Sequence, residues 1–125
     1  MIRGIVENRR ATVNLMMYLS NQQKLSIEFE IDTAFQGALA IPPDAVAALG
    51  LEFITKTPTI PANGIPFQAN LHETVIEWDD KVFVVPVLAM GLRPLIGTVL
   101  LDDHDLYIAY TEGGEVLIKR RSNTS

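Results

Sequence analysis

The chain contains no cysteine, so disulfide bonds, catalytic thiolates and zinc sites built on cysteine are all excluded. Cationic side chains are also scarce, because 10 Lys and Arg face 15 Asp and Glu and give a formal charge of −5. This deficit argues against nucleic acid as a partner, since phosphate binding requires clustered cations. No apolar run reaches the roughly 18 residues of a membrane span, and the N-terminal MIRGIVENRR has only a short apolar stretch, whereas a signal-peptide core needs about 7 to 15 apolar residues. We therefore expect a cytoplasmic protein without a membrane partner.

The residues that are present suit one hydrophobic core. Hydrophobic residues make up 48% of the 125 residues and charged residues 20%, which is typical of a globular domain. A chain of this length has room for one domain and little more. We place that domain at residues 1–121 and expect the polar residues 122–125 to form a frayed tail.

Runs of β-branched or alternating residues dominate the chain and predict a mostly β fold. The expected strands cover 3–7, 11–19, 24–31, 52–57, 70–78, 81–89, 105–110 and 115–120. The one clear helix is expected over 42–50, because proline stands at its start and Gly50 at its end. A second, shorter helix can follow Gly97.

Asn63-Gly64 is the strongest hairpin signal in the sequence, because both residues tolerate positive φ. Pro58, Pro61 and Pro66 surround this turn, and proline is excluded from central strands because it has no N–H to donate. We therefore expect the hairpin at an edge of the sheet or projecting from it. Its role stays open at this point between a lid over a site and an ordinary exposed loop.

An aspartate ends the most regular strand pattern in the chain. Ile27, Phe29 and Ile31 alternate with acidic residues, which predicts a half-buried strand and places Asp32 on its polar side. The next residues are mostly apolar, so Asp32 lies where the chain returns to the core. Taken alone, an Asp-Thr pair at a strand end is more often an Asx-turn than a catalytic group.

A second unusual feature is the glycine in PLIGTVLL, residues 94–101. A glycine within an apolar strand usually marks the close approach of another backbone. We therefore expect Gly97 to contact a neighbouring segment of the main chain.

Together these features resemble the retropepsin-like aspartic proteases, in particular their small bacterial and cyanobacterial members. That family has an apolar strand ending in Asp-Thr-Gly or Asp-Ser-Gly, then a flap hairpin, then a late apolar-apolar-Gly motif. This chain has EIDTAFQGALAIPP, PANGIPF and PLIGTVLL in that order. The resemblance implies a closed acid-protease barrel with one lobe per chain, and aspartic endopeptidase activity on a peptide or protein substrate with no cofactor and no metal.

The resemblance also implies residue roles, with Asp32 as the catalytic acid and base. The residues expected to support its loop are Thr33, Ala34 and Gly97. The residues expected in the substrate-binding flap are Ala62, Asn63 and Gly64. Ala34 departs from the family pattern, because the family has glycine there and alanine adds a methyl group and loses freedom at positive φ.

Aspartic proteolysis requires two carboxylates close together, because the pair holds one proton between them. The chain has a single Asp-Thr motif, so a second chain must supply the partner. A two-fold homodimer brings two copies of one residue to its axis, and we expect Asp32 to meet its own copy there. The terminal strands 3–7 and 115–120 are expected to help pair the chains through their edges.

The alternative is a non-catalytic dimer of the same fold that binds a peptide or partner protein along a strand edge. Other chemistries have weaker support in the sequence. His72 and His104 lack the HExxH spacing, DDHD at 102–105 lacks the pattern of a calcium loop, and no serine stands in GxSxG. No metal site is therefore expected.

Overall fold

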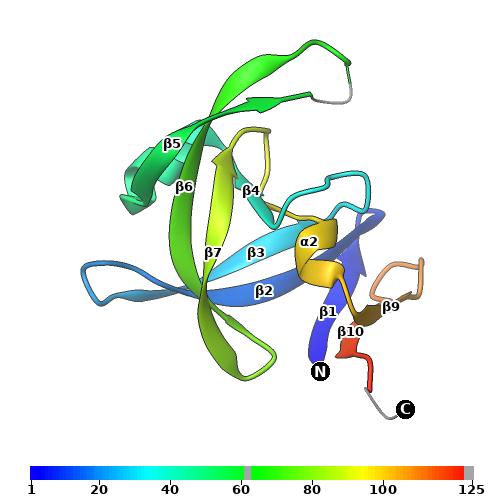
Figure 1. Cartoon of the computed structure of the whole chain (residues 1–125). Coiled ribbons are helices and arrows are strands. Elements are labelled where there is room, and N and C mark those ends of the chain that lie inside the picture. The colour runs from blue at the N-terminus through cyan, green and yellow to red at the C-terminus, as the bar shows by residue number, and fades with distance from the viewer. Residues whose placement is uncertain (61–62, 123–125) are drawn as a thin grey trace.

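A ring of six strands forms the centre of the fold in the computed structural model, which describes residues 1–60 and 63–122 (Figure 1). Around the ring the strands are β6 (Phe67–Trp78), β7 (Lys81–Ala89), β4 (Leu39–Ile41), β8 (Leu95–Ile96), β3 (Lys24–Ile31) and β2 (Arg10–Tyr18). A pairing of β2 with β6, at Met17↔Ile76 and Tyr18↔Val75, closes the ring. The predicted mostly β fold with strands closed on themselves is confirmed.

Further strands extend the sheet on both sides of the ring. β5 (Glu52–Thr59) follows β6 and forms one edge, and β1 (Ile2–Glu7), β10 (Glu115–Arg120) and β9 (His104–Ile108) follow β2 in that order. The β5–β6 hairpin projects at the top of Figure 1, so the prediction of a projecting edge hairpin is confirmed. Proline 58 lies in the edge strand β5, as expected for a residue without an N–H.

The terminal strands pair with each other instead of offering open edges. β1 lies between β10 and β2, and β10 lies between β1 and β9. The expectation that 3–7 and 115–120 pair two chains through free edges therefore does not hold, because both strands already have two neighbours. The outer edge on this side of the sheet is β9.

Two short strands that the sequence analysis missed organise the region around Asp32. β8 is inserted between β3 and β4, parallel to β3 at Ile31↔Ile96 and antiparallel to β4 at Leu39↔Ile96. The chain that leaves β3 must consequently pass over the end of β8 before it reaches β4. Residues 32–38 form this crossing segment.

Both predicted helices are present in the described residues. α1 (Pro43–Leu49) ends at Gly50, whose φ of 65° is the left-handed conformation that glycine adopts without strain. α2 (Thr98–Leu101) begins directly after Gly97. Gly97 therefore lies at the junction of β8 and α2, with the short helix directly after it as expected from the sequence.

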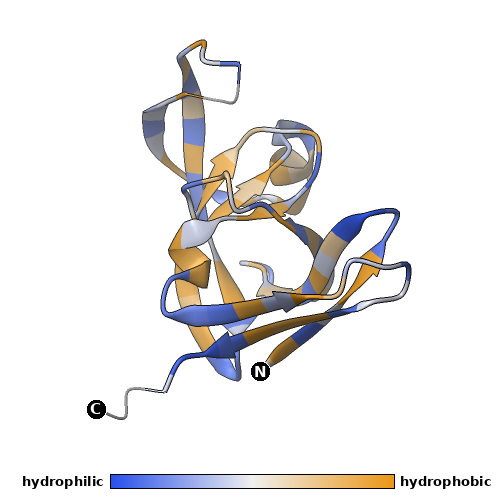
Figure 2. Ribbon diagram, turned by 90° about the vertical axis from the view of Figure 1, so that its right-hand side faces the viewer, coloured by the Kyte–Doolittle hydropathy of each residue, from blue (hydrophilic) through white to orange (hydrophobic). Residues whose placement is uncertain are grey.

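The core includes buried residues from the ring strands, from β1 and β10 and from both helices. Polar and apolar bands alternate along the strands (Figure 2). The largest fully buried side chains of the core include Met17, Phe29, Leu39, Ile76 and Ile96. Within residues 1–60 and 63–122 no helix has the length and apolar character needed to cross a membrane. The predicted flap residue Ala62 and the last three residues of the predicted tail, 123–125, lie outside the described residues.

Candidate active site

Asp32 is held at the point where β3 and β8 end side by side. Its backbone N–H donates to the carbonyl of Ile96 at 2.9 Å, which extends the β3–β8 pairing by one residue. The half-buried carboxylate accepts the N–H of Ala34 at its Oδ1, over 3.0 Å. This Asx-turn fixes the direction of the carboxylate through Oδ1, and Oδ2 takes no part in that hydrogen bond.

Thr33 and Ala34 form the exposed top of this turn. Ala34 does not have a positive φ, so alanine loses nothing here by its restriction to negative φ. The expectation that the alanine is conformationally costly is therefore wrong for this loop. The N–H that the family's glycine would provide is also present and is directed at Asp32.

Gly97 supports the loop from below by close backbone contact, as predicted. A Cβ atom built on it would lie 2.2 Å from the carbonyl oxygen of Gly37 and 2.6 Å from that of Phe35, so no side chain fits. The backbone N–H of Gly97 donates to Ala38 at 3.0 Å, and that of Thr98 donates to Phe35 at 2.8 Å. The crossing segment 32–38 is thereby tied to the β8–α2 junction along its length.

The Asp32 carboxylate lines a hollow of about 490 Å³. We call this the Asp32 hollow, and the residues that line it are Asp32, Ala34, Phe35, Gln36, Thr59, Ile60, Met90 and Leu95. It combines the crossing segment with the end of β5, the residue after β7 and the start of β8. Three segments that are distant in sequence, 32–36, 59–60 and 90–95, thus meet at one hollow beside Asp32.

The β5–β6 hairpin reaches this hollow through its stem and not through the residues predicted for its tip. Thr59 and Ile60 line the hollow, whereas Asn63 and Gly64 do not. The tip has the expected turn chemistry, because Gly64 has a φ of 77° and the Oδ1 of Asn63 accepts the N–H of Ile65 at 3.0 Å. The structure therefore groups Asp32 and Ala34 with the stem of the hairpin.

The sequence analysis did not select several of the residues that line the hollow. Met90 and Leu95 lie at the two ends of the connection between β7 and β8. Ile60 also lines the hollow, and it is 72% exposed although its side chain is aliphatic. The only sequence signal for Ile60 is an isolated apolar residue next to Pro61 in the hairpin. Single exposed apolar residues are common in the surface loops of any protein, so this signal does not identify Ile60 as a site residue from the sequence.

One acidic residue close to Asp32 is partly neutralised by two arginines. The Oε1 of Glu30 lies 3.5 Å from Nε of Arg10 and 3.7 Å from a guanidinium nitrogen of Arg93. All three side chains are partly exposed, so each pair contributes little to stability. The ion pair nevertheless links Arg93, in the connection between β7 and β8, to Glu30 near the end of β3. The backbone N–H of Glu30 also donates to the carbonyl of Pro94, next to Arg93.

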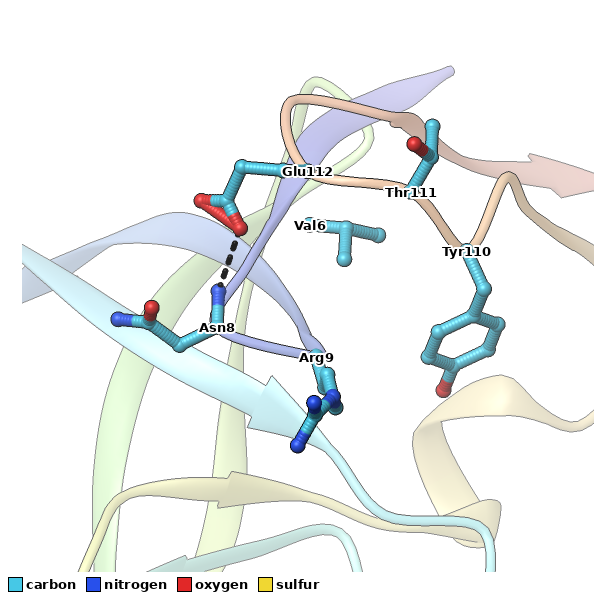
Figure 3. Close-up of a pocket in the computed structure, with 6 residues that line it drawn as sticks. All are labelled: Val6, Asn8, Arg9, Tyr110, Thr111 and Glu112. Carbon is cyan, nitrogen blue, oxygen red and sulfur yellow. Dashed lines mark hydrogen bonds between the residues drawn. The ribbon is translucent and has the colours of Figure 1, made fainter.

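A larger hollow of about 830 Å³ lies between the β1–β2 turn and the loop that follows β9 (Figure 3). It is lined by Val6, Asn8, Arg9, Tyr110, Thr111 and Glu112. Its carboxylate, Glu112, accepts the backbone N–H of Asn8 at 3.0 Å and bridges the two loops. We take the smaller hollow as the candidate active site, because the carboxylate of the larger one serves to hold two turns together.

The histidines lie apart and serve different contacts. His72 faces the carbonyl of Leu51 at 3.1 Å, and His104 accepts the indole N–H of Trp78 at 3.1 Å. Across the described part of the chain, no three His, Asp or Glu side chains gather closely enough to hold a metal ion.

Comparison with known proteins identifies the fold. No protein-family model matches the chain, and no curated protein sequence matches it. The structure matches the crystal structure of a retropepsin-like aspartic protease from Rickettsia conorii with a TM-score of 0.52 and 18% sequence identity. The match covers 94% of this chain and 92% of the other. The chain therefore has a retropepsin-like fold.

Proposed function

We propose that the protein is an aspartic endopeptidase whose active site forms between two copies of the chain. The observation that carries this proposal is the placement of Asp32 at the junction of β3, β8 and α2, facing a hollow beneath the stem of the β5–β6 hairpin. The crystal structure that it resembles is described as an aspartic protease, which supports the same class of chemistry.

The chemistry requires two Asp32 carboxylates, one from each copy, sharing one proton. The ionised member takes a proton from a water molecule, whose oxygen attacks the carbon of the peptide carbonyl. The protonated member donates a hydrogen bond to the carbonyl oxygen, and a proton then passes to the leaving nitrogen as the C–N bond breaks. The Ala34 N–H, at 3.0 Å from Oδ1, keeps each carboxylate in the required direction.

The remaining residues position an extended peptide. The β5–β6 hairpin closes over the substrate and excludes water, with Asn63 and Gly64 at its turn. Thr33, which is exposed at the top of its loop, braces the two catalytic loops against each other through its hydroxyl. Gly97 has no side chain, so the backbone of the crossing segment at Phe35 and Gly37 can lie directly against the β8–α2 junction.

Replacing the catalytic carboxylate provides the test. Asp32→Asn keeps the shape of the side chain but cannot transfer a proton, so cleavage should fall by about 10²-fold to 10⁴-fold or to background. The assay is a mixed peptide library incubated between acidic and neutral pH and read by mass spectrometry. Wild-type cleavage should be fastest at acidic to mildly acidic pH, where the pair carries one proton.

The matched control is Asp80→Asn, because Asp80 is exposed in the β6–β7 turn and has a φ of 67° that asparagine also tolerates. This variant should cut like the wild type. Equal cutting by wild type and Asp32→Asn would contradict the proposal. If neither cuts but both bind library peptides, the protein is a peptide-binding dimer, for which the open edge of β5 beside the hollow offers a pairing site.

A further inference from the structure

The aromatic ring of Phe35 occupies an unusual place beside the candidate catalytic residue. Phe35 follows Asp32 closely in the crossing segment, and its backbone is fixed at both ends. Its N–H donates to the carbonyl of Asp32 at 3.1 Å, and its own carbonyl accepts both the N–H and the hydroxyl of Thr98, at 2.8 and 3.3 Å. The ring is therefore held on a rigid section of main chain.

Two glycines make room for this ring. A Cβ atom built on Gly37 would lie 2.5 Å from Cζ of Phe35, and one built on Gly97 would lie 2.6 Å from Cδ2. Contacts that short do not occur between real side chains, so the ring takes up the volume that both glycines leave free. At Gly37 the three nearest atoms all belong to the Phe35 ring, whereas at Gly97 backbone oxygens are also close.

The same residue lines the Asp32 hollow together with Asp32 itself. The side chain is partly buried, and the backbones of Gly37 and Gly97 block movement of the ring toward them. Phe35 is thus a wall of the hollow next to Asp32. A residue as small as alanine at this position would leave that part of the hollow open.

From this geometry we infer that Phe35 is a specificity-determining residue, which narrows the pocket beside Asp32 so that the substrate residue bound there is small or β-branched. This inference rests on the proposed endopeptidase function. A wall of this kind discriminates by exclusion, and even single methylene groups in a pocket change kcat/KM by about 10-fold to 200-fold. Aromatic side chains should therefore be selected against at one position next to the scissile bond.

The first experiment compares the cleavage profiles of wild type and Phe35→Ala with the same peptide library. The variant should gain aromatic residues at that one position, with kcat/KM for an aromatic peptide relative to an alanine peptide rising by about tenfold or more. Phe35→Leu is the second variant, which keeps an apolar side chain in contact with the glycines should the alanine variant not fold. Phe83→Ala is the matched control, because it makes the same chemical change at an exposed phenylalanine of β7 that does not line the hollow, and its profile should stay that of the wild type.

The second experiment tests the wedge without any need for cleavage. Gly37→Ala should lower the melting temperature in the wild-type background, because the new methyl group meets the ring. The same substitution should have little effect in the Phe35→Ala background, since Gly37 does not have a positive φ and the ring is gone.

The possible failures are distinguishable. Wild-type cleavage with an unchanged profile in both Phe35 variants would overturn the inference alone. Equal effects of Gly37→Ala in the two backgrounds would overturn it as well, because the ring would not be the wall that the geometry indicates. If the wild type cuts no peptide, the proposed function fails and this inference fails with it.

Discussion

Ala34 shows how one side chain near the carboxylate can be judged from backbone geometry. The sequence alone marks it as a departure from a glycine motif, which predicts strain at positive φ. In the structure its φ is not positive, its methyl group is exposed and its N–H binds Asp32. The N–H directed at the carboxylate, which any residue except proline can provide, is thus present with alanine.

Ala34→Gly should consequently bring no large gain in activity and a small loss of stability. Glycine increases the conformational entropy of the unfolded chain, so the free energy of unfolding should fall by about 0.4–1 kcal/mol. Denaturant unfolding and the peptide-library assay measure the two effects on the same preparations. A strong rise in cleavage rate would show that the methyl group obstructs the substrate, contrary to this assignment.

Individual site residues differ in how far the sequence could predict them. Asp32 and Gly97 are recognisable because each breaks a local pattern, one by ending an alternating strand and the other by interrupting an apolar run. Phe35, Thr59 and Met90 break no pattern, and their role follows only from the way the strands bring them to one hollow. The position of these side chains in the site depends on which strands are neighbours in the sheet, and a short stretch of sequence does not contain that information.

At the scale of elements, long strands were predictable and short ones were not. β3 and β7 carry enough residues for alternation or β-branched enrichment to be seen, whereas β4 and β8 have only 3 and 2 residues. These two strands exist because their neighbours supply hydrogen bonds on both sides, as in the β3–β8–β4 order. They are also the elements that create the crossing segment of the site.

The β5–β6 hairpin should be more mobile than the ring. β5 is an edge strand, and apolar side chains on both sides of the tip are exposed, with Ile60 at the end of the stem at 72% and Ile65 at 66%. Amide hydrogen exchange at Ile60, Gly64 and Ile65 should be much faster than at Met17, which is fully buried in the ring. Similar protection at Met17 and at the tip would contradict a hairpin that opens for substrate.

Trp78 and His104 join the end of β6 to the start of β9. Trp78 is 4% exposed, and its indole N–H, which can only donate, binds Nε2 of His104, while Nδ1 of His104 lies 2.7 Å from the carbonyl of Asp102. These contacts assign the neutral Nδ1–H tautomer to His104. His104→Leu leaves a buried N–H without its partner and should lower the free energy of unfolding by about 1–3 kcal/mol.

The chain offers a direct readout of that contact, because Trp78 is its only tryptophan. Denaturant unfolding followed by tryptophan fluorescence should show the loss in His104→Leu and a smaller one in His104→Gln, which retains an acceptor. His72→Leu is the control for removing a histidine, since His72 packs against Phe53 on another part of the sheet. Equal stability of the leucine and glutamine variants at position 104 would show that the indole N–H gains nothing from its partner.

At the scale of the whole molecule, the arrangement of the strands restricts how two copies can meet. The Asp32 loop with Thr33 is exposed, and the projecting hairpin lies on the same hollow. β1 and β10 are flanked by neighbours within one chain, so the proposed dimer cannot depend on their free edges. We therefore expect contacts between the two Asp32 loops to contribute substantially to its assembly.

Thr33 provides the test of that assembly, because the residue is exposed in a single chain and a two-fold axis would bring two copies of its hydroxyl together. Sedimentation at micromolar concentrations should give twice the mass of one chain for the wild type and for Asp32→Asn. Thr33→Val keeps the shape but removes hydrogen bonds worth about 0.5–1.5 kcal/mol each, so the dimer Kd should rise by about tenfold. Thr55→Val, on the exposed edge strand β5, makes the same chemical change away from the loop and should leave the Kd unaltered. A wild type that sediments as a monomer throughout this range would leave each Asp32 without its partner, and the proposed chemistry would have no second carboxylate.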